Sequence, residues 1–154
     1  MILKNNLQIC KATNDDLPDL INLLQSLFTI EQDFTFNEKK HEEGIILLIN
    51  NKSSEVILVK FENEVIGMIT IQKIISTVMG TKVGLIEDFI IKDDYRDLGV
   101  GTYLLEYIKD YAKKHSLTRL QLVCDEDNTT AKEFYTNKKF KRSNLNAWYY
   151  TLDK

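Results

Sequence analysis

The stretch of the chain best suited to chemistry runs from Glu87 to Gly101 and reads EDFIIKDDYRDLGVG. Its apolar residues predict a strand, and a turn with Arg96 and Gly99 leads from that strand directly into a helical pattern. Backbone N–H groups at the start of such a helix are unpaired and lie at the positive end of the helix dipole. Because glycine lets an anion approach the backbone closely, the turn favours phosphate or diphosphate. A tight turn that needs glycine for backbone reasons alone gives the same spacing.

The two common nucleotide-binding loops do not fit this stretch. It lacks the spacing G-x-G-x-x-G, and no Gly-Lys-Ser or Gly-Lys-Thr follows it. The preceding strands also look like an antiparallel meander rather than a parallel sheet. A different phosphate-containing ligand is therefore indicated.

Two adjacent acids, Glu87 and Asp88, interrupt an otherwise apolar strand. Side chains alternate along a strand, so the two carboxyls should point to opposite faces of the sheet, and a bulge would exchange their directions. An ion pair with a neighbouring lysine or arginine is the structural alternative for these acids. Binding of a substrate amine by Glu87 is a third role.

The elements that must position these groups follow from hydrophobic periodicity and turn residues. Helical patterns cover residues 17–28, 38–50, 100–114 and 129–137. Strand patterns cover residues 8–11, 56–61, 65–75, 82–92, 119–124 and 148–152. Meander strands in the first half and strand-helix-strand crossovers in the second half predict a mixed α/β sheet with helices on both faces. The stripe of the third helix predicts that Tyr103, Tyr107 and Tyr111 belong to the core.

Composition limits the class of protein. The 154 residues are 44% hydrophobic and 28% charged, as in one folded domain spanning residues 1–154, without linker or repeat. The net charge of −3 predicts no nucleic-acid partner. The longest apolar run, residues 45–49, is far shorter than the roughly 20 residues that cross a bilayer, and no export signal is expected. Two distant cysteines predict a reduced, cytoplasmic protein without a metal site.

These motifs resemble the GCN5-related N-acetyltransferase (GNAT) superfamily. The superfamily's acetyl-CoA motif, Q/R-x-x-G-x-G/A, is matched by Arg96, Gly99 and Gly101. A second motif opens with an asparagine at the head of a short helix and ends in Gly-Phe. Its residues here are Asn128, Ala131, Phe134, Tyr135 and Phe140, with Lys139 in place of the glycine. The run from Ile86 to Gly101 resembles the branch that acetylates diamines and polyamines.

The resemblance implies the GNAT fold and its cofactor, acetyl-CoA. This fold is a mostly antiparallel mixed sheet of about six or seven strands with about four helices, and a splayed strand pair holds the cofactor. The main chain of Phe89, Ile90 and Ile91 would bind the pantetheine arm and polarise the thioester. The diphosphate and pantetheine contacts would come from Arg96, Asp97, Leu98, Gly99, Val100, Gly101, Thr102, Asn128 and Ala131.

The resemblance also implies catalytic roles. An alkylammonium, with a pKa of about 10, must lose a proton before its nitrogen can attack the thioester. Glu87 is the expected base, acting directly or through a water. Tyr135 matches the tyrosine that protonates the departing thiolate, and its alternative role is a core tyrosine on a helix face. No covalent cysteine intermediate is expected.

The acceptor site is expected in the loop after the first helix. Glu31, Asp33 and Phe34 lie there, and with Glu87 and Asp88 they suit a small-molecule amine that joins a cationic group to an apolar body. By resemblance the chain forms a homodimer. The competing interpretations are a non-catalytic acyl-CoA sensor or interaction module, and a GNAT enzyme for peptide, protein or aminoglycoside amines.

Overall fold

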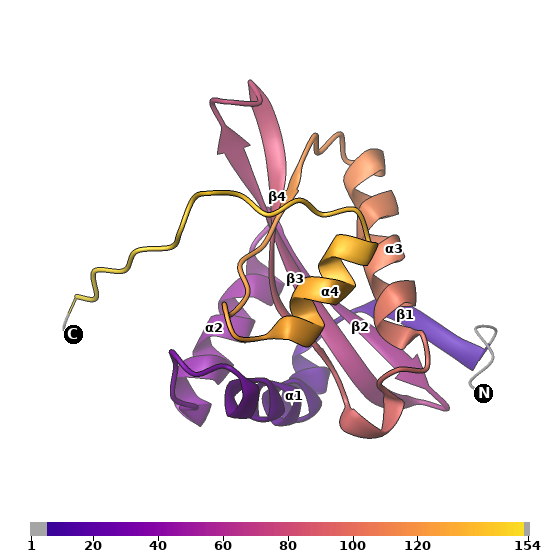
Figure 1. The fold of residues 1–154 in the computed structure, drawn as a ribbon. Coiled ribbons are helices and arrows are strands. Elements are labelled where there is room, and N and C mark those ends of the chain that lie inside the picture. The colour runs from indigo at the N-terminus through magenta and orange to yellow at the C-terminus, as the bar shows by residue number, and fades with distance from the viewer. Residues whose placement is uncertain (1–5, 153–154) are drawn as a thin grey trace. The chain divides into compact units, whose positions relative to one another are not determined.

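The computed structural model describes residues 6–152, which form two units (Figure 1). The first unit ends at Leu122 and holds the sheet and three helices, and the second begins at Val123 and holds one helix. Each unit is described by itself below. The single domain inferred from the sequence stays a prediction.

The sheet of the first unit contains five strands among the described residues, in the order β1-β2-β3-β4-β5. The first four strands pair antiparallel, and β5 pairs parallel with β4. This confirms the predicted mixed sheet, with fewer strands than the six or seven expected. The strands are β1 (Leu7–Lys11), β2 (Ser54–Phe61), β3 (Glu64–Ser76), β4 (Thr81–Ile91) and β5 (Leu120–Gln121).

Three helices flank this sheet. After a short 3-10 turn, η2 (Asn14–Asp16), helix α1 (Leu17–Ile30) begins with Pro18 in its first turn, where no N–H is required. Helix α2 (Glu38–Asn50) is capped by the side chain of Asn37, which accepts from the N–H of Lys40 at 3.0 Å. A second 3-10 turn, η3 (Asp93–Tyr95), precedes α3 (Val100–Lys114). No helix in the described part of the chain is long and apolar enough to cross a bilayer.

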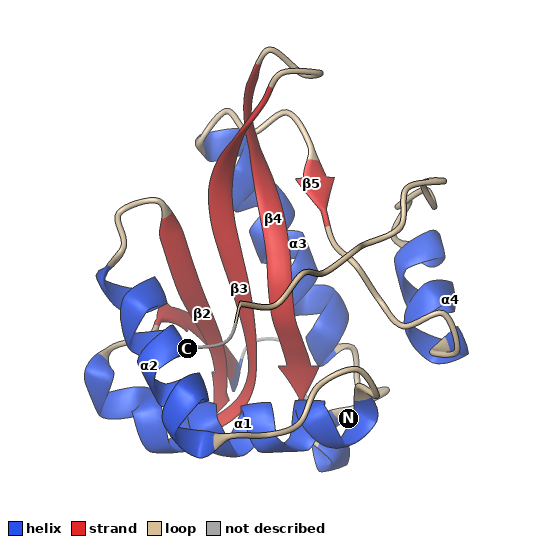
Figure 2. Ribbon diagram, turned by 90° about the vertical axis from the view of Figure 1, so that its left-hand side faces the viewer, coloured by secondary structure: helices blue, strands red, loops and turns tan. Residues whose placement is uncertain are grey.

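The two faces of the sheet have separate cores. Met68 and Ile90 on one face join a buried cluster with the apolar stripes of α1 and α2. On the other face, Glu55 is opposite Ile71 in the β2–β3 register, and its carboxylate accepts from the hydroxyl of Tyr111 on α3 at 3.4 Å. Helix α3 therefore covers the face away from α1 and α2 (Figure 2).

One of the three tyrosines predicted for the core of α3 lies outside it. Tyr111 is buried and Tyr103 is half-buried, but Tyr107 is exposed. The buried stripe of α3 runs through Leu104 and Ile108, and Tyr107 lies at its margin. The prediction of a core role is wrong for Tyr107 because the stripe is narrower than its apolar residues indicate.

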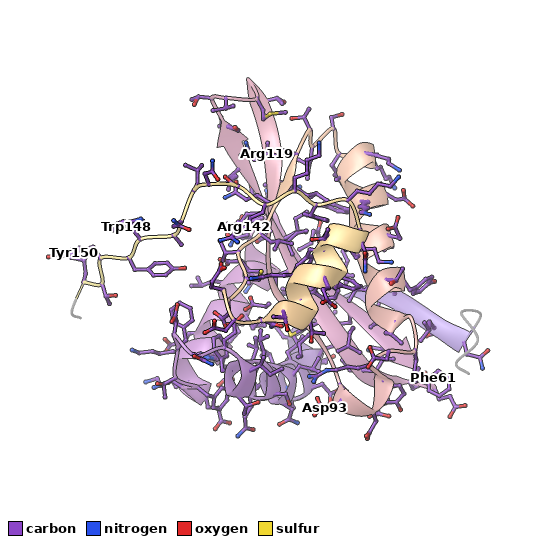
Figure 3. The ribbon with its side chains drawn as sticks, in the orientation of Figure 1. Phe61, Asp93, Arg119, Arg142, Trp148 and Tyr150 are labelled. Atoms are coloured by element: carbon purple, nitrogen blue, oxygen red, sulfur yellow. The ribbon has the colours of Figure 1, made fainter. Side chains whose placement is uncertain are left out.

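The second unit contains α4 (Thr129–Asn137) and an extended C-terminal segment. The predicted strand over residues 148–152 is absent, and the strand predicted over residues 119–124 is reduced to Leu120–Gln121. Trp148 is 93% exposed and Tyr150 is 90% exposed, and Figure 3 shows both side chains on the extended segment. Strand-forming residues become a strand only when a neighbouring strand pairs with them, and none does so here within residues 6–152.

Candidate active site

A bulge in β4 governs the geometry around the two acids. Thr70 is opposite Glu87 and Met68 is opposite Ile90 in the β3–β4 register, so two residues of β4 lie across from Ile69 alone. Asp88 is one of those two residues and has a left-handed backbone with φ of 47°. The bulge therefore interrupts the alternation of side chains within the acid pair.

The bulge brings both carboxyls to one face of the sheet. Glu87 shares its face with Thr70, its direct partner, and Asp88 reaches the same side because its Oδ2 accepts from the Thr70 hydroxyl at 3.2 Å. The expectation that the two acids point to opposite faces is therefore wrong. Neither acid forms an ion pair among the recorded contacts of residues 6–152, so the structural alternative gains no support.

The environment disfavours negative charge at this pair. Partial burial of the carboxyl, and then the charge of Asp88, raise the pKa of Glu87 although its side chain is partly open to solvent. Burial also raises the pKa of Asp88, and the hydrogen bond from Thr70 opposes that increase. Two carboxyls that hold protons more tightly than usual can bind a cation or take up a proton.

Beyond the bulge, no strand within residues 6–152 pairs with the edge of β4 that faces away from β3. Strand β5 pairs with β4 only at Gly84 and Leu85. The N–H of Lys92 donates to Ile66 on β3, so alternation directs the main-chain groups of Phe89 and Ile91 to the open edge and those of Ile90 to β3. Ile90 pairs with Met68 of β3 in this register, so its main-chain groups face β3 rather than this edge, where the sequence predicted them.

The turn between β4 and α3 is held by Arg96. Its Nε donates to the carbonyl of Ile91 at 2.9 Å, and its Nη2 lies 2.7 Å from Oδ1 of Asp93. The guanidinium thus ties the turn to the end of β4. Asp97 and Gly99 have positive φ values, 58° and 83°, and Gly99 caps α3 in the left-handed conformation that glycine adopts most readily.

Several consecutive main-chain N–H groups run through this turn into the start of α3. The first recorded donor within α3 is the N–H of Tyr103, which donates to Gly99 at 3.0 Å. Among the described residues, the N–H groups of residues 97–102 have no recorded acceptor. A Cβ added to Gly99 would meet no atom within 4 Å, so the space over the turn is open. Such a turn fits a diphosphate.

A cavity of about 330 Å³ adjoins the turn, between α1 and η3. Its polar lining comes from three residues on the outer face of α1 and from two residues at or just after η3. The lining residues are Gln25, Ser26, Thr29, Ile30, Asp93 and Arg96. Sequence reasoning missed the α1 residues because polar positions on the outer face of a helix carry no signal that separates a site from solvent.

The loop predicted to bind the acceptor lies between α1 and α2. Phe34 is 49% exposed, and its ring lies 6.2 Å from that of Phe28. The His41 ring lies 4.5 Å from Phe28 and 5.0 Å from Phe36, and burial lowers the pKa of His41. No sequence pattern places His41 in this aromatic cluster, because a lone histidine has no characteristic spacing.

In the second unit, α4 presents the remaining predicted residues. The Asn128 side chain accepts from the N–H of Ala131 at 3.0 Å and so caps the helix, as its position predicts. The ring of Tyr135 lies 5.4 Å from that of Phe134 and 5.7 Å from that of Phe140. These residues belong to the second unit, whereas Glu87 and the turn belong to the first.

Lys139, which replaces the glycine of the family motif, adopts the left-handed backbone conformation at the C-terminal end of α4. Lys139 has a φ of 68° and its N–H donates to Thr136 at 2.9 Å, while the N–H of Phe140 donates to Tyr135 at 3.0 Å. This pair of bonds is a Schellman motif, in which glycine is the preferred residue at the left-handed position. The turn geometry is therefore retained despite the substitution.

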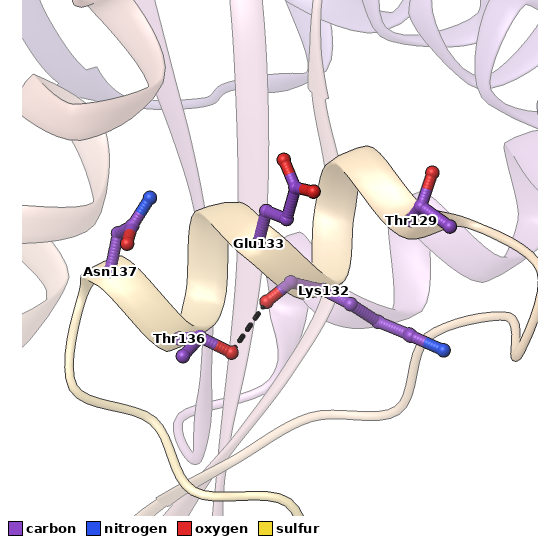
Figure 4. Close-up of a pocket in the computed structure, with 5 residues that line it drawn as sticks. All are labelled: Thr129, Lys132, Glu133, Thr136 and Asn137. Atoms are coloured by element: carbon purple, nitrogen blue, oxygen red, sulfur yellow. Dashed lines mark hydrogen bonds between the residues drawn. The ribbon is translucent and has the colours of Figure 1, made fainter.

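One face of α4 borders a hollow of about 420 Å³, shown in Figure 4. The hydroxyl of Thr136 donates to the carbonyl of Lys132 at 2.8 Å, and the Lys132 ammonium reaches the backbone carbonyl of Glu126 at 2.7 Å. Two polar side chains of this hollow, Lys132 and Thr136, are therefore bonded within the unit. Its lining consists of Thr129, Lys132, Glu133, Thr136 and Asn137.

Comparison with protein families decides the identity of the fold. Residues 17–140 match the acetyltransferase (GNAT) family, and this range holds the bulge, the amide turn and α4. The chain belongs to the GNAT family. It is an N-acetyltransferase, and members of its family use acetyl-CoA. Within residues 6–152, no cluster of His, Cys, Asp and Glu could hold a metal ion.

Relatives of this GNAT chain include an uncharacterized N-acetyltransferase of Archaeoglobus fulgidus, 22% identical over 88% of this chain and 94% of the relative. Streptothricin acetyltransferase A of Bacillus subtilis is 31% identical over 68% of this chain and 58% of the relative. Among solved structures, a possible acetyltransferase from Clostridium difficile has a TM-score of 0.84 at 19% identity, covering 96% and 99% of the two chains. An aminoglycoside acetyltransferase from an uncultured soil metagenomic sample has a TM-score of 0.81 at 21% identity, covering 99% and 100%. These structures share the fold with this GNAT chain.

Proposed function

We propose that this GNAT enzyme transfers the acetyl group of acetyl-CoA to a primary amine of a small, multiply cationic molecule, by direct attack in a ternary complex. The observation that carries the proposal is the arrangement along one open edge of β4. The acid-bearing bulge lies at one end of that edge, and the amide turn lies at the other.

The amide turn is the proposed diphosphate site. N–H groups from Asp97 to Thr102 would donate to phosphate oxygens, and Arg96 would hold the turn in place through Ile91. Main-chain groups of Phe89 and the N–H of Ile91 would bind the pantetheine arm, while the Ile91 carbonyl stays bonded to Arg96. When bound, acetyl-CoA supplies the acetyl group as a thioester, and N–H donors at the open edge would stabilise charge on the thioester oxygen.

The acids are proposed to receive the acceptor. An ammonium must lose a proton before its nitrogen can attack, and Glu87 is open to solvent with a raised pKa, which suits proton uptake. Asp88 lies beside it and provides a second negative charge. Glu31 and Asp33 in the loop after α1 would bind further positive charges of the acceptor, against the exposed ring of Phe34.

In the second unit, Tyr135 is the proposed acid that returns a proton to the leaving thiolate. Contacts of its ring with the rings of Phe134 and Phe140 define the direction of the side chain. Asn128 and Ala131 at the head of the same helix are proposed to contact the pantetheine arm. No covalent step is proposed for Cys124, because burial raises the pKa of its thiol and reduces its thiolate at neutral pH.

The acceptor class rests on charge rather than on a shaped pocket. Polyamines and aminoglycosides both carry several ammonium groups, as a site with neighbouring acids requires. Similarity to the fold of an aminoglycoside acetyltransferase supports aminoglycosides, and similarity to a streptothricin acetyltransferase supports a small-molecule acceptor. The acid pair in the strand supports both polyamines and aminoglycosides.

The experiment is thiol release from acetyl-CoA, followed with a thiol-reactive dye across diamines, polyamines, aminoglycosides, amino acids and peptides. We expect turnover with a polyamine or an aminoglycoside and none with amino acids. Turnover with peptides alone would contradict the acceptor class. Thermal stabilisation by acetyl-CoA without thiol release from any amine would instead favour a sensor or interaction module.

We also propose a cytoplasmic homodimer, with the C-terminal segment pairing as a strand only once a second copy of the chain is present. The C-terminal segment carries strand-forming residues with large exposed apolar side chains, namely Leu145, Trp148, Tyr149, Tyr150 and Leu152. Light scattering on the eluted full chain should give twice the mass of 17.9 kDa. A mass equal to one chain at micromolar concentration would contradict the dimer.

A further inference from the structure

A buried hydroxyl lies beside the acid pair, on the neighbouring strand. Thr70 is 1% exposed in the middle of β3, between the buried apolar residues Ile69 and Ile71. A hydroxyl in such surroundings costs free energy unless it is hydrogen-bonded. Its bond at 3.2 Å to Oδ2 of Asp88 supplies the partner, so Thr70 and Asp88 form a coupled pair.

In this pair the Thr70 hydroxyl is the hydrogen-bond donor and the Asp88 carboxylate is the acceptor. Because the Thr70 hydroxyl donates, Asp88 accepts through Oδ2, and within residues 6–152 no donor is recorded for its other oxygen, Oδ1. A carboxylate has about four acceptor positions, so most of this capacity is left for another donor. The left-handed backbone of Asp88 gives the bulge one defined geometry, and the Thr70 bond adds a defined side-chain direction.

We propose that Thr70 is a positioning residue for acetyl transfer, which holds the Asp88 carboxylate charged and directed toward the acceptor ammonium and leaves Glu87 as the proton acceptor. The inference rests on the proposed function. It separates two acids that are adjacent in sequence: Asp88 is fixed and binds, while Glu87 is more open and exchanges protons. Burial raises the pKa of Asp88, and the hydrogen bond from Thr70 opposes that increase, so loss of the bond would favour the neutral carboxyl further.

The variants Thr70→Val and Thr70→Ser test the proposal. Valine keeps the shape of threonine but removes the donor, and serine restores the donor. We expect Thr70→Val to lower kcat/KM for the amine by about tenfold, through KM for the amine, with KM for acetyl-CoA unchanged. Thr70→Ser should stay within about twofold of the wild type. The proposal is overturned if Thr70→Val leaves amine KM unchanged or alters both KM values equally.

A matched control separates the effect of losing the Thr70–Asp88 hydrogen bond from the effect of replacing any buried hydroxyl on β3. Ser76 is also buried on β3, and its hydroxyl accepts from Met79 near the hairpin tip. Ser76→Ala should leave both KM values unchanged. In an Asp88→Asn background, Thr70→Val should cause little further loss, and an undiminished further loss would overturn the coupling.

A readout without turnover distinguishes failure of this proposal from failure of the proposed function. The ¹³C signal of the Asp88 carboxyl should shift when spermidine is added to the wild type and to Thr70→Ser, and should not shift for Thr70→Val. If no amine is acetylated but these shifts occur, the proposed function fails and the positioning role stands. If the wild-type signal does not shift, the positioning role fails.

Discussion

Ile86 and Ile90 lie four residues apart on β4 but face opposite sides of the sheet. Ile86 is opposite Ile71 on the face covered by α3, and Ile90 is opposite Met68 in the core with α1 and α2. An even spacing in a regular strand keeps side chains on one face. The bulge at Asp88 reverses the faces, and as a result the two acids share one side of the sheet.

The raised pKa of Asp88 makes a prediction about stability. A carboxyl whose pKa is higher in the folded than in the unfolded state destabilises the fold as pH rises through that interval. Asp88→Asn removes this penalty, so it should raise Tm at pH 8 by about 1–4 °C and have no effect below the ordinary carboxyl pKa of about 3.9. Thermal unfolding of Asp88→Asn and the wild type at pH 3 and pH 8 measures these differences in Tm. An equal shift at pH 3 and pH 8 would contradict it.

The backbone of Asp88 supplies the control. Asparagine tolerates the left-handed conformation, whereas alanine does not, at a cost of about 1–2 kcal/mol. Asp88→Ala should therefore be less stable than Asp88→Asn at every pH.

Lys139 occupies a position that favours glycine. Lys139 has a φ of 68° in the Schellman turn of α4, where a side chain is strained and glycine is not. Lys139→Gly should therefore raise the free energy of unfolding by about 0.5–1 kcal/mol. The neighbour Lys138 has an ordinary φ of −89°, so Lys138→Gly should be neutral or destabilising. Urea denaturation of both variants measures the difference. A loss of stability in Lys139→Gly would contradict the turn geometry.

Gly99 tests the cofactor site. Its Cβ position is open and its φ is 83°, so Gly99→Ala should cost about 1 kcal/mol of stability and raise the Kd of acetyl-CoA by about tenfold or more, since a methyl group would lie where phosphate oxygens approach. Gly80 at the β3–β4 tip has a φ of 66° and the same open space. Gly80→Ala should share the stability cost and leave Kd unchanged, as calorimetric titration would measure. Equal Kd values for both variants would place the cofactor elsewhere.

Tyr135 tests the proposed acid. Removal of its hydroxyl in Tyr135→Phe should lower kcat by about 100-fold, the typical effect of losing a general acid, while the Kd of acetyl-CoA stays unchanged. Tyr107, exposed on α3, supplies a control because Tyr107→Phe removes the same atom away from the site. Unchanged turnover in Tyr135→Phe would exclude the tyrosine from the mechanism.

The sequence predicts the elements whose patterns are local. The ranges expected for α2, α3 and α4 agree with the structure, because caps, stripes and Gly99 act within a few residues. The terminal strand expected over residues 148–152 is wrong because pairing depends on a distant segment. The same dependence shortens the strand expected over residues 119–124 to β5.

In the candidate site, too, the features that depend on nearby residues are predictable from the sequence, and those that depend on distant residues are not. The amide turn is visible in sequence because glycine spacing and a helix start are local features. The shared face of Glu87 and Asp88 is not visible, because a one-residue bulge leaves the apolar pattern nearly intact. Thr70 is also hidden, since threonine suits a strand with or without a partner for its hydroxyl.

The central claim is that the turn between β4 and α3 binds the diphosphate of acetyl-CoA. A crystal structure of the full chain with acetyl-CoA tests it most directly. The account predicts diphosphate oxygens within hydrogen-bond distance of N–H groups between Asp97 and Thr102. A diphosphate bound away from these amides would contradict it.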